Sequence, residues 1–148
     1  MRRTWLILSA LLFVLPAISS PAGAEPAIGV AMDDFSYTDT SAEPANQTAA
    51  HERRLAAFMT ALRRDVGEGG RYRLVASAQD GAAFKVLGGI QKTSTLVQWA
   101  KIAVIDVNAK KLVMDKLYTF RGDNDESWER GHDPVSYTHL TLPTNREV

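Results

Sequence analysis

The stretch LVQWAKIAVIDV, residues 96–107, followed by LVMDKLYTF, residues 112–120, decides the fold of this chain. In the first segment apolar side chains occupy both alternating faces, which predicts a β-strand covered on both sides. The short polar turn Asn108-Ala109-Lys110 separates the two segments, so we expect the second to return antiparallel and form a long hairpin.

Ahead of this hairpin, the chain predicts a buried strand, a loop and an amphipathic helix. Residues 28–35 are a short apolar run that ends in acidic residues, whereas residues 36–47 are polar and read as a loop. Thr48 is expected to cap the helix, and a cluster of glycines ends it near residue 70. The predicted buried stripe is Leu55, Phe58, Met59, Leu62 and Val66, and the solvent face carries Arg53, Arg54, Arg63 and Arg64, with His51 beside the arginines.

Two further strands and a second helix complete the predicted architecture. Residues 72–77 and 84–90 are strand-like, and Gly88-Gly89 in the latter indicates close backbone approach or a bulge. After the hairpin, Asp123 or Asp125 is expected to cap a C-terminal helix. The predicted fold class is α/β: a single small domain, residues 25–133, with a mixed sheet, a strand–helix–strand unit, a long antiparallel hairpin and a truncated C-terminal helix.

The composition excludes several classes of function. The chain has no cysteine, which excludes disulfides, iron–sulfur clusters, thiolate zinc sites and a thiol nucleophile. Its 17 basic and 17 acidic side chains argue against nucleic acid as a partner, because nucleic-acid binders normally carry a basic excess. Only His51 and His132 precede residue 134, which argues against a histidine-based triad or metal site. No catalytic residue, metal or cofactor is predicted.

The N-terminus has the pattern of a secretory signal. Arg2 and Arg3 precede an apolar run that ends at Ile18, and small residues follow as far as Ala24. This pattern predicts cleavage after Ala24. The run is shorter than the ~20 residues that a membrane-spanning helix needs. We therefore expect residues 1–24 to direct secretion across the inner membrane, with a periplasmic location and no membrane span after cleavage.

Residues 134–148 are expected to be foreign to the protein. Back-translation of Val135 to Thr144 produces a nucleotide string that resembles the adapter of a transposase-based sequencing library. The native chain is then expected to continue differently after Asp133, within the helix. If these codons are instead genomic, His132 and His139 become candidate functional residues.

Two polar stretches form the predicted interaction surface. Its residues are Gln91, Lys92, Thr93, Ser94, Arg121, Asp123, Asp125, Glu126 and Trp128. Polar side chains beside a tryptophan suit a protein interface. An alternative reading places Trp128 in the core and pairs Arg121 with Asp125 or Glu126. A different hypothesis assigns the loop Asp123 to Glu126, with Lys92, to a small ligand or metal, or to weak hydrolysis.

Three stretches of the chain resemble an uncharacterised bacterial family of small secreted proteins, labelled only as a domain of unknown function. They are GGIQKTSTL at 88–96, RGDNDESWERG at 121–131, and the pattern from Asp34-Phe35 to Asp39-Thr40-Ser41. More distantly, the order of elements is similar to the small α/β domain at the N-terminus of the periplasmic protein TolB and in curli-secretion lipoproteins. These resemblances imply partner binding or assembly rather than catalysis.

The sequence therefore predicts an uncharacterised secreted protein that acts as a non-catalytic module of the cell envelope. Its expected partner is an unknown envelope protein or a second copy of itself. The alternative is a small-ligand or metal-binding carrier, or a weak hydrolase, that uses the loop from Asp123 to Glu126.

Overall fold

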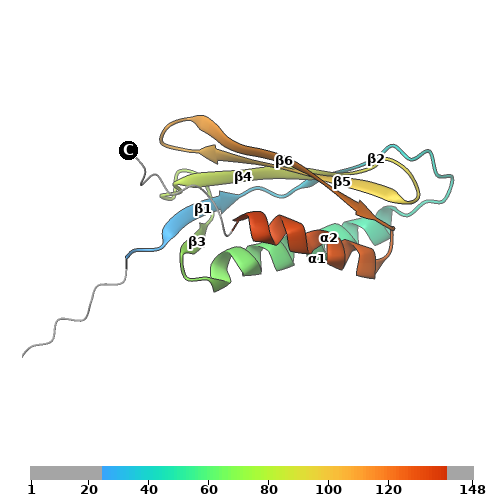
Figure 1. Ribbon diagram of the computed structural model, residues 1–148, viewed down its shortest axis with the longest axis horizontal. Coiled ribbons are helices and arrows are strands. Elements are labelled where there is room, and N and C mark those ends of the chain that lie inside the picture. Colours follow the sequence, from blue (N-terminus) through green and yellow to red (C-terminus); the bar gives the residue numbers. More distant parts are fainter. Residues whose placement is uncertain (1–24, 140–148) are drawn as a thin grey trace, which may run out of the picture.

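The computed structural model describes residues 25–139, and their side chains as far as Val135. Its elements are β1 (Ile28–Met32), β2 (Ser36–Asp39), α1 (Thr48–Glu68), β3 (Tyr72–Val75), β4 (Phe84–Lys92), β5 (Val97–Asp106), β6 (Lys111–Arg121) and α2 (Asp125–His139). Both helices lie on one side of a single sheet (Figure 1). The predicted signal, its cleavage site after Ala24, and residues 140–148 lie outside the described residues.

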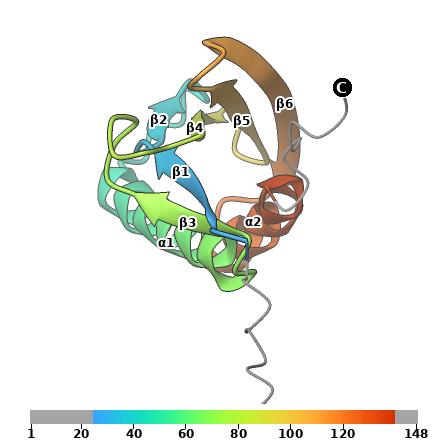
Figure 2. The ribbon, with the colours of Figure 1, turned by 90° about the vertical axis from the view of Figure 1, so that its left-hand side faces the viewer.

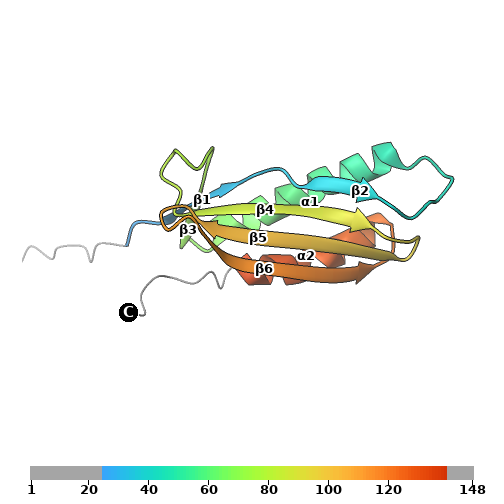
Figure 3. The ribbon, with the colours of Figure 1, turned by 90° about the horizontal axis from the view of Figure 1, so that it is seen from above.

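The sheet is mixed, as the sequence predicts. Its strand order is β3-β1-β4-β5-β6, and β2 also pairs with β4. β1 runs parallel to both β3 and β4, whereas β4, β5 and β6 are antiparallel neighbours. Figure 2 looks along the strands and shows the sheet curving around the two helices, and Figure 3 shows β4, β5 and β6 side by side above them. The predicted strand–helix–strand unit is β1, α1 and β3.

The loop predicted over residues 36–47 contains a strand instead. β2 continues the path of β1 along β4, with Ser36 opposite Gly89. The alternation signal is weak because its side chains are exposed, except for the partly buried Tyr37. Phe35 lies between the two strands and is buried over Gly88, where an added Cβ would come within 2.5 Å of the Phe35 ring. The close approach expected at Gly88 is therefore confirmed.

The buried stripe of α1 agrees with the prediction, with two corrections. His51 is only 2% exposed and extends the buried stripe, because it lies seven positions before Phe58. Leu55 is only partly buried. The predicted cap is also wrong: Gln47 precedes the first helical residue, and the side chain of Asn46 accepts the hydrogen bond from the Thr48 N–H.

The prediction that β5 is covered on both sides is wrong for the described part of the chain. Ala100, Ile102 and Val104 face the helices and are fully buried. The other side of the sheet carries exposed apolar side chains at Trp99, Leu112 and Leu117, and this surface is called the outer sheet face. Two-sided cover fails because both helices pack on the same side of the sheet.

α2 begins with a reciprocal cap formed by Asn124 and Ser127. The Ser127 N–H donates to the Asn124 side chain at 2.8 Å, and the Asn124 N–H donates to the Ser127 hydroxyl at 3.0 Å. Asn124 therefore performs the capping role that the sequence assigned to Asp123 or Asp125. The helix runs to His139 with Pro134 inside it, and Val135 is buried. The foreign origin of residues 134–148 stays a prediction.

Candidate functional site

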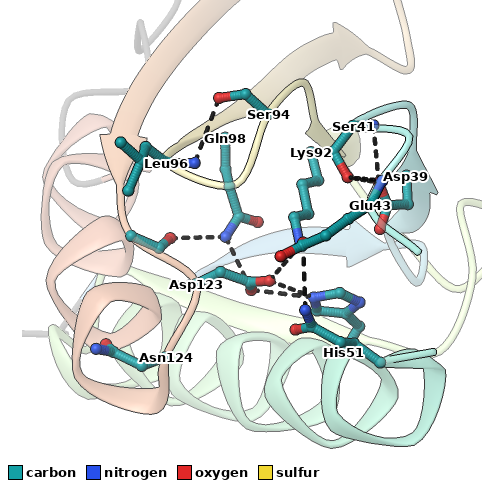
Figure 4. A network of polar contacts seen from close by, with 12 residues as sticks. Asp39, Ser41, Glu43, His51, Lys92, Ser94, Leu96, Gln98, Asp123 and Asn124 are labelled. Atoms are coloured by element: carbon teal, nitrogen blue, oxygen red, sulfur yellow. Dashed lines mark hydrogen bonds and ion pairs between the residues drawn. The ribbon is translucent and has the colours of Figure 1, made fainter. Parts of the chain in front are cut away.

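Asp123 is the centre of a buried cluster of charged and polar side chains (Figure 4). It lies in the short connection between β6 and α2, and its side chain is only 8% exposed. Its carboxylate contacts five side chains: Lys92 Nζ at 2.6 Å, His51 Nε2 at 2.8 Å, Arg54 Nη1 at 3.0 Å, Gln98 Nε2 at 3.1 Å and Trp128 Nε1 at 3.3 Å. We call these six residues, together with Glu43, the Asp123 cluster.

Lys92 is the most deeply buried charge of the cluster. It is the last residue of β4 and points to the same side of the sheet as Ile90, two positions earlier. Its side chain is 0% exposed, and its ammonium group pairs with both Asp123 and Glu43. Glu43 comes from the loop between β2 and α1. An ammonium group cannot be buried at tolerable cost without such partners, so these contacts hold the loop and the β6–α2 connection against β4.

The cluster keeps its two central groups charged. Burial alone would raise the pKa of Asp123, but hydrogen bonds from Lys92, His51 and Trp128 outweigh it and lower that pKa to about 2. Burial likewise works to lower the pKa of Lys92, and its hydrogen bonds to Asp123 and Glu43 raise it above its usual value. Asp123 and Lys92 therefore form an ion pair throughout the physiological pH range.

Tyr37 closes the cluster on the β2 side. Its ring lies over that of His51, with the centroids 4.6 Å apart. Burial, and then the charges of Asp39 and Asp123, raise the pKa of Tyr37, so its phenol stays neutral. Among the described residues, the Tyr37 hydroxyl and Gln98 Oε1 are buried atoms without a hydrogen-bond partner. The other amide atom of Gln98 donates to Asp123 and to the carbonyl oxygen of Gly122.

The loop from Asp123 to Glu126 does not converge on one point. Asp123 faces the interior, whereas Asp125 and Glu126 are exposed. Asp125 accepts from Arg54 Nε at 2.7 Å, and Glu126 pairs with Arg130 on the next turn of α2. In the part of the chain that the structure describes, no three histidine, aspartate or glutamate side chains are grouped to hold a metal ion.

The two stretches of the predicted interaction surface do meet, but several of their residues face inward. Lys92 and Asp123 belong to the buried cluster, and Trp128 packs in the core between Phe58 and Phe120, as in the alternative reading. The side chains of Gln91, Thr93 and Ser94 hydrogen-bond to Thr40, the Val97 carbonyl and the backbone of the β4–β5 turn, respectively.

The exposed residues of that surface are Arg121, Asp125 and Glu126. Arg121 makes no ion pair with any residue that the structure describes, so the predicted pairing with Asp125 or Glu126 is wrong.

Four members of the cluster were missed by the sequence prediction as site residues. They are Glu43, His51, Arg54 and Gln98. A usable signal existed for Gln98, because it alternates with Ala100, Ile102 and Val104 on the inward side of β5. A polar residue at an inward position indicates a buried partner. No comparable signal exists for Glu43, which lies in an irregular loop.

The comparison with protein families finds one similarity. The model of family DUF3280, described as "Protein of unknown function (DUF2380)", matches residues 76–139, less than half of the chain. The expected resemblance to an uncharacterised family is thus confirmed over that part. The comparison with curated proteins gives no match.

Solved structures show what the fold is similar to. The PelC dodecamer from Paraburkholderia phytofirmans is 13% identical, with a TM-score of 0.52 over 84% of this chain and 93% of that one. Protein XCC0632 from Xanthomonas campestris, of family DUF330, is 11% identical, with a TM-score of 0.51 over 83% and 88% of the two chains. At these identities the similarity shows the fold alone, a small α/β domain.

TolB from Acinetobacter baumannii also matches, at 15% identity and a TM-score of 0.48. The match covers 78% of this chain but only 28% of the TolB chain. Within the described residues, neither helix is long and apolar enough to cross a bilayer.

Proposed function

We propose that this domain is a non-catalytic module of the bacterial envelope that acts by binding a protein partner or by self-association. The observation that carries the proposal is that the charged groups of the Asp123 cluster pair with one another inside the domain. Lys92, the strongest candidate nucleophile, has no exposed surface. A catalytic lysine or carboxylate has to reach a substrate, whereas these groups connect one part of the chain to another.

Two further observations support a binding role. The surface beside the cluster displays exposed charged and apolar groups at the β4–β5 turn and at the start of α2. The similar structure PelC is described as a dodecamer, so this fold is compatible with assembly. The proposal includes export directed by residues 1–24 and a periplasmic location.

The rival proposal is a carrier or weak hydrolase built on the loop from Asp123 to Glu126. A bound ligand raises the free energy of unfolding by RT ln(1 + [L]/Kd), about 2.7 kcal/mol at a hundredfold excess over Kd. Melting curves with calcium, phosphate and sugars therefore test it. Because Asp123 and Asp125 are already paired with cations, we expect no shift of the melting temperature.

Association is tested directly by sedimentation velocity of the purified protein over a wide concentration range. A parallel crosslinking experiment in the envelope fraction identifies partners of the full chain. The proposal predicts either a concentration-dependent oligomer or a specific crosslinked protein. A protein that stays monomeric at high concentration and crosslinks to nothing contradicts it.

A further inference from the structure

The β5–β6 hairpin, residues 97–121, is a basic part of an otherwise acidic domain. It contains five basic and two acidic side chains, a net charge of +3. Residues 25–96 and 122–133 together contain nine basic and fourteen acidic side chains, a net charge of −5. The nearly balanced charge of the domain is therefore divided unevenly, and such a separation turns the basic part toward a surface of negative charge.

The basic side chains of the hairpin are available to a partner. All five are exposed, and within the described residues only Lys101 is ion-paired, with Asp115 at 3.4 Å. Asp106, the other acidic residue of the hairpin, is buried and accepts a hydrogen bond from the Ala109 N–H in the turn. The four remaining cations are Lys110 and Lys111 where the hairpin turns, Lys116 on the edge strand β6, and Arg121 at the end of β6.

The same hairpin presents apolar side chains on the outer sheet face. Trp99 is 38% exposed, Leu112 53% and Leu117 57%. The register places Leu117 opposite Lys101 and Trp99 opposite Thr119, so apolar and basic side chains are neighbours on this face. Neither helix covers them, because both helices lie on the other side of the sheet (Figure 1). The outer sheet face of the hairpin therefore combines exposed apolar groups with positive charge.

The surface of an anionic phospholipid bilayer matches this combination. Its headgroups supply a plane of negative charge, and its acyl chains begin directly below them. Tryptophan favours the boundary between these two layers, because its ring is apolar and its N–H is polar. Lysine lays its apolar stem along such a boundary and keeps its ammonium group at the headgroups. Four of the five cations are lysines, a residue depleted at protein–protein interfaces, so the composition favours lipid over protein.

We infer that the β5–β6 hairpin attaches the domain to the surface of a bilayer that contains anionic phospholipid. Trp99 and Leu117 lie at the boundary with the acyl chains, and the cations of the hairpin lie at the headgroups. The inference goes beyond the proposed function and does not depend on it, because the helices lie on the side of the sheet that faces away from the bilayer and stay open to a protein partner. The attachment is peripheral and weakens as salt screens the charges.

Co-sedimentation with vesicles tests the attachment. The chain from Glu25 onward is used, because the apolar segment before Ile18 would bind vesicles by itself. Vesicles of equal parts phosphatidylglycerol and phosphatidylcholine should bind the protein, and vesicles of phosphatidylcholine alone should bind it at least about tenfold more weakly. Raising the salt concentration to about 1 M should release the protein, because the Debye length then falls to about 3 Å.

Charge reversal separates the hairpin from the rest of the domain. Lys116→Glu should weaken binding to the phosphatidylglycerol vesicles at least about tenfold, since it replaces an attraction by a repulsion. Arg130→Glu is the matched control, because it makes the same change of net charge at an exposed position of α2, on the opposite side of the sheet. Its binding should change by less than about twofold, as screening removes charges distant from the headgroups. Circular dichroism checks the fold of both variants.

Tryptophan fluorescence tests whether apolar side chains reach the acyl chains. Residues 25–148 contain two tryptophans, of which Trp99 is exposed and Trp128 is buried. Bromine atoms on the acyl chains quench a tryptophan only at close range. They should quench the emission of the vesicle-bound protein and leave the Trp99→Phe variant, which keeps only Trp128, nearly unquenched.

The outcomes separate the inference from the proposed function. The inference is overturned if the protein does not bind the phosphatidylglycerol vesicles, if Lys116→Glu and Arg130→Glu weaken binding equally, or if bromine does not quench Trp99. It is also overturned if Lys116→Glu abolishes a specific protein crosslink while vesicles bind nothing, because the hairpin then contacts a protein. Self-association and crosslinking decide the proposed function without vesicles, so either conclusion can fail alone.

Discussion

The domain has two buried regions of opposite chemistry. The apolar core includes Leu62 of α1 together with Val30 and Val86 of the sheet, and many small contributions stabilise the packing of the two layers. In the Asp123 cluster, a single carboxylate contacts five side chains from α1, β4, β5 and α2. Buried apolar surface stabilises the core, whereas ion pairs and hydrogen bonds stabilise the Asp123 cluster. The free energy of unfolding should therefore respond differently to substitutions in the two regions.

Asp123→Ala is expected to have the largest effect. It leaves Lys92 buried with only Glu43 to pair with, and breaking a buried ion pair costs about 3–5 kcal/mol of unfolding free energy. Urea unfolding measures the change. Glu126→Ala, at an exposed position of the same loop, should stay within about 0.5 kcal/mol. Equal and small losses in both variants would contradict the central role of Asp123.

Leu62→Ala measures the apolar core on the same scale. Leu62 is fully buried in α1, and truncating a buried leucine costs about 3 kcal/mol through lost burial and the cavity that remains. The same urea experiment provides the value. A loss below about 1 kcal/mol would show that the core contracts around the cavity and is less rigid than its burial indicates.

Acid titration separates the two regions most directly. The folded pKa of Asp123, about 2, lies below its ordinary value of 3.8, so its charged form stabilises the fold above that value. This stabilisation, roughly 2 kcal/mol, is lost as the pH falls from about 4 to about 2. Unfolding free energies at a series of pH values should show this loss in the unchanged protein and not in Asp123→Asn. Parallel pH curves for the two proteins would contradict it.

Leu117→Thr is expected to have the smallest effect. Leu117 lies on the outer sheet face and is more than half exposed, so little apolar area is lost, and threonine suits a strand. The unfolding free energy should change by less than about 0.5 kcal/mol. A larger loss would mean that this face is covered in solution by another copy, which sedimentation of the variant would detect.

The apolar core could be predicted from the sequence, because it is built from local periodicity. The spacing of Phe58, Met59, Leu62 and Val66 is enough to place the inner face of α1, and apolar runs separated by turn residues are enough to find β4, β5 and β6. β2 escaped prediction because its pairing with β4 uses backbone groups, and four mostly exposed residues leave no pattern.

The Asp123 cluster could not be predicted in the same way. His51 and Asp123 are 72 residues apart, and Lys92 and Glu43 are 49 apart, so no spacing in the chain connects them. Lys92 and Asp123 were both expected on one interaction surface, and the structure does bring them together. Their burial follows from the tertiary fold, which places the last residue of β4 beneath the β6–α2 connection.

The position of Asp123 in the chain has a consequence for biosynthesis. A ribosome completes His51, Arg54, Lys92 and Gln98 well before it reaches Asp123, so the nascent chain holds these groups without the carboxylate that they share. A growing chain folds its domains from the N-terminus as they become complete. This domain reaches completeness only when the segment after β6 emerges. Until that segment is made, the buried ammonium group of Lys92 lacks one of its two carboxylate partners.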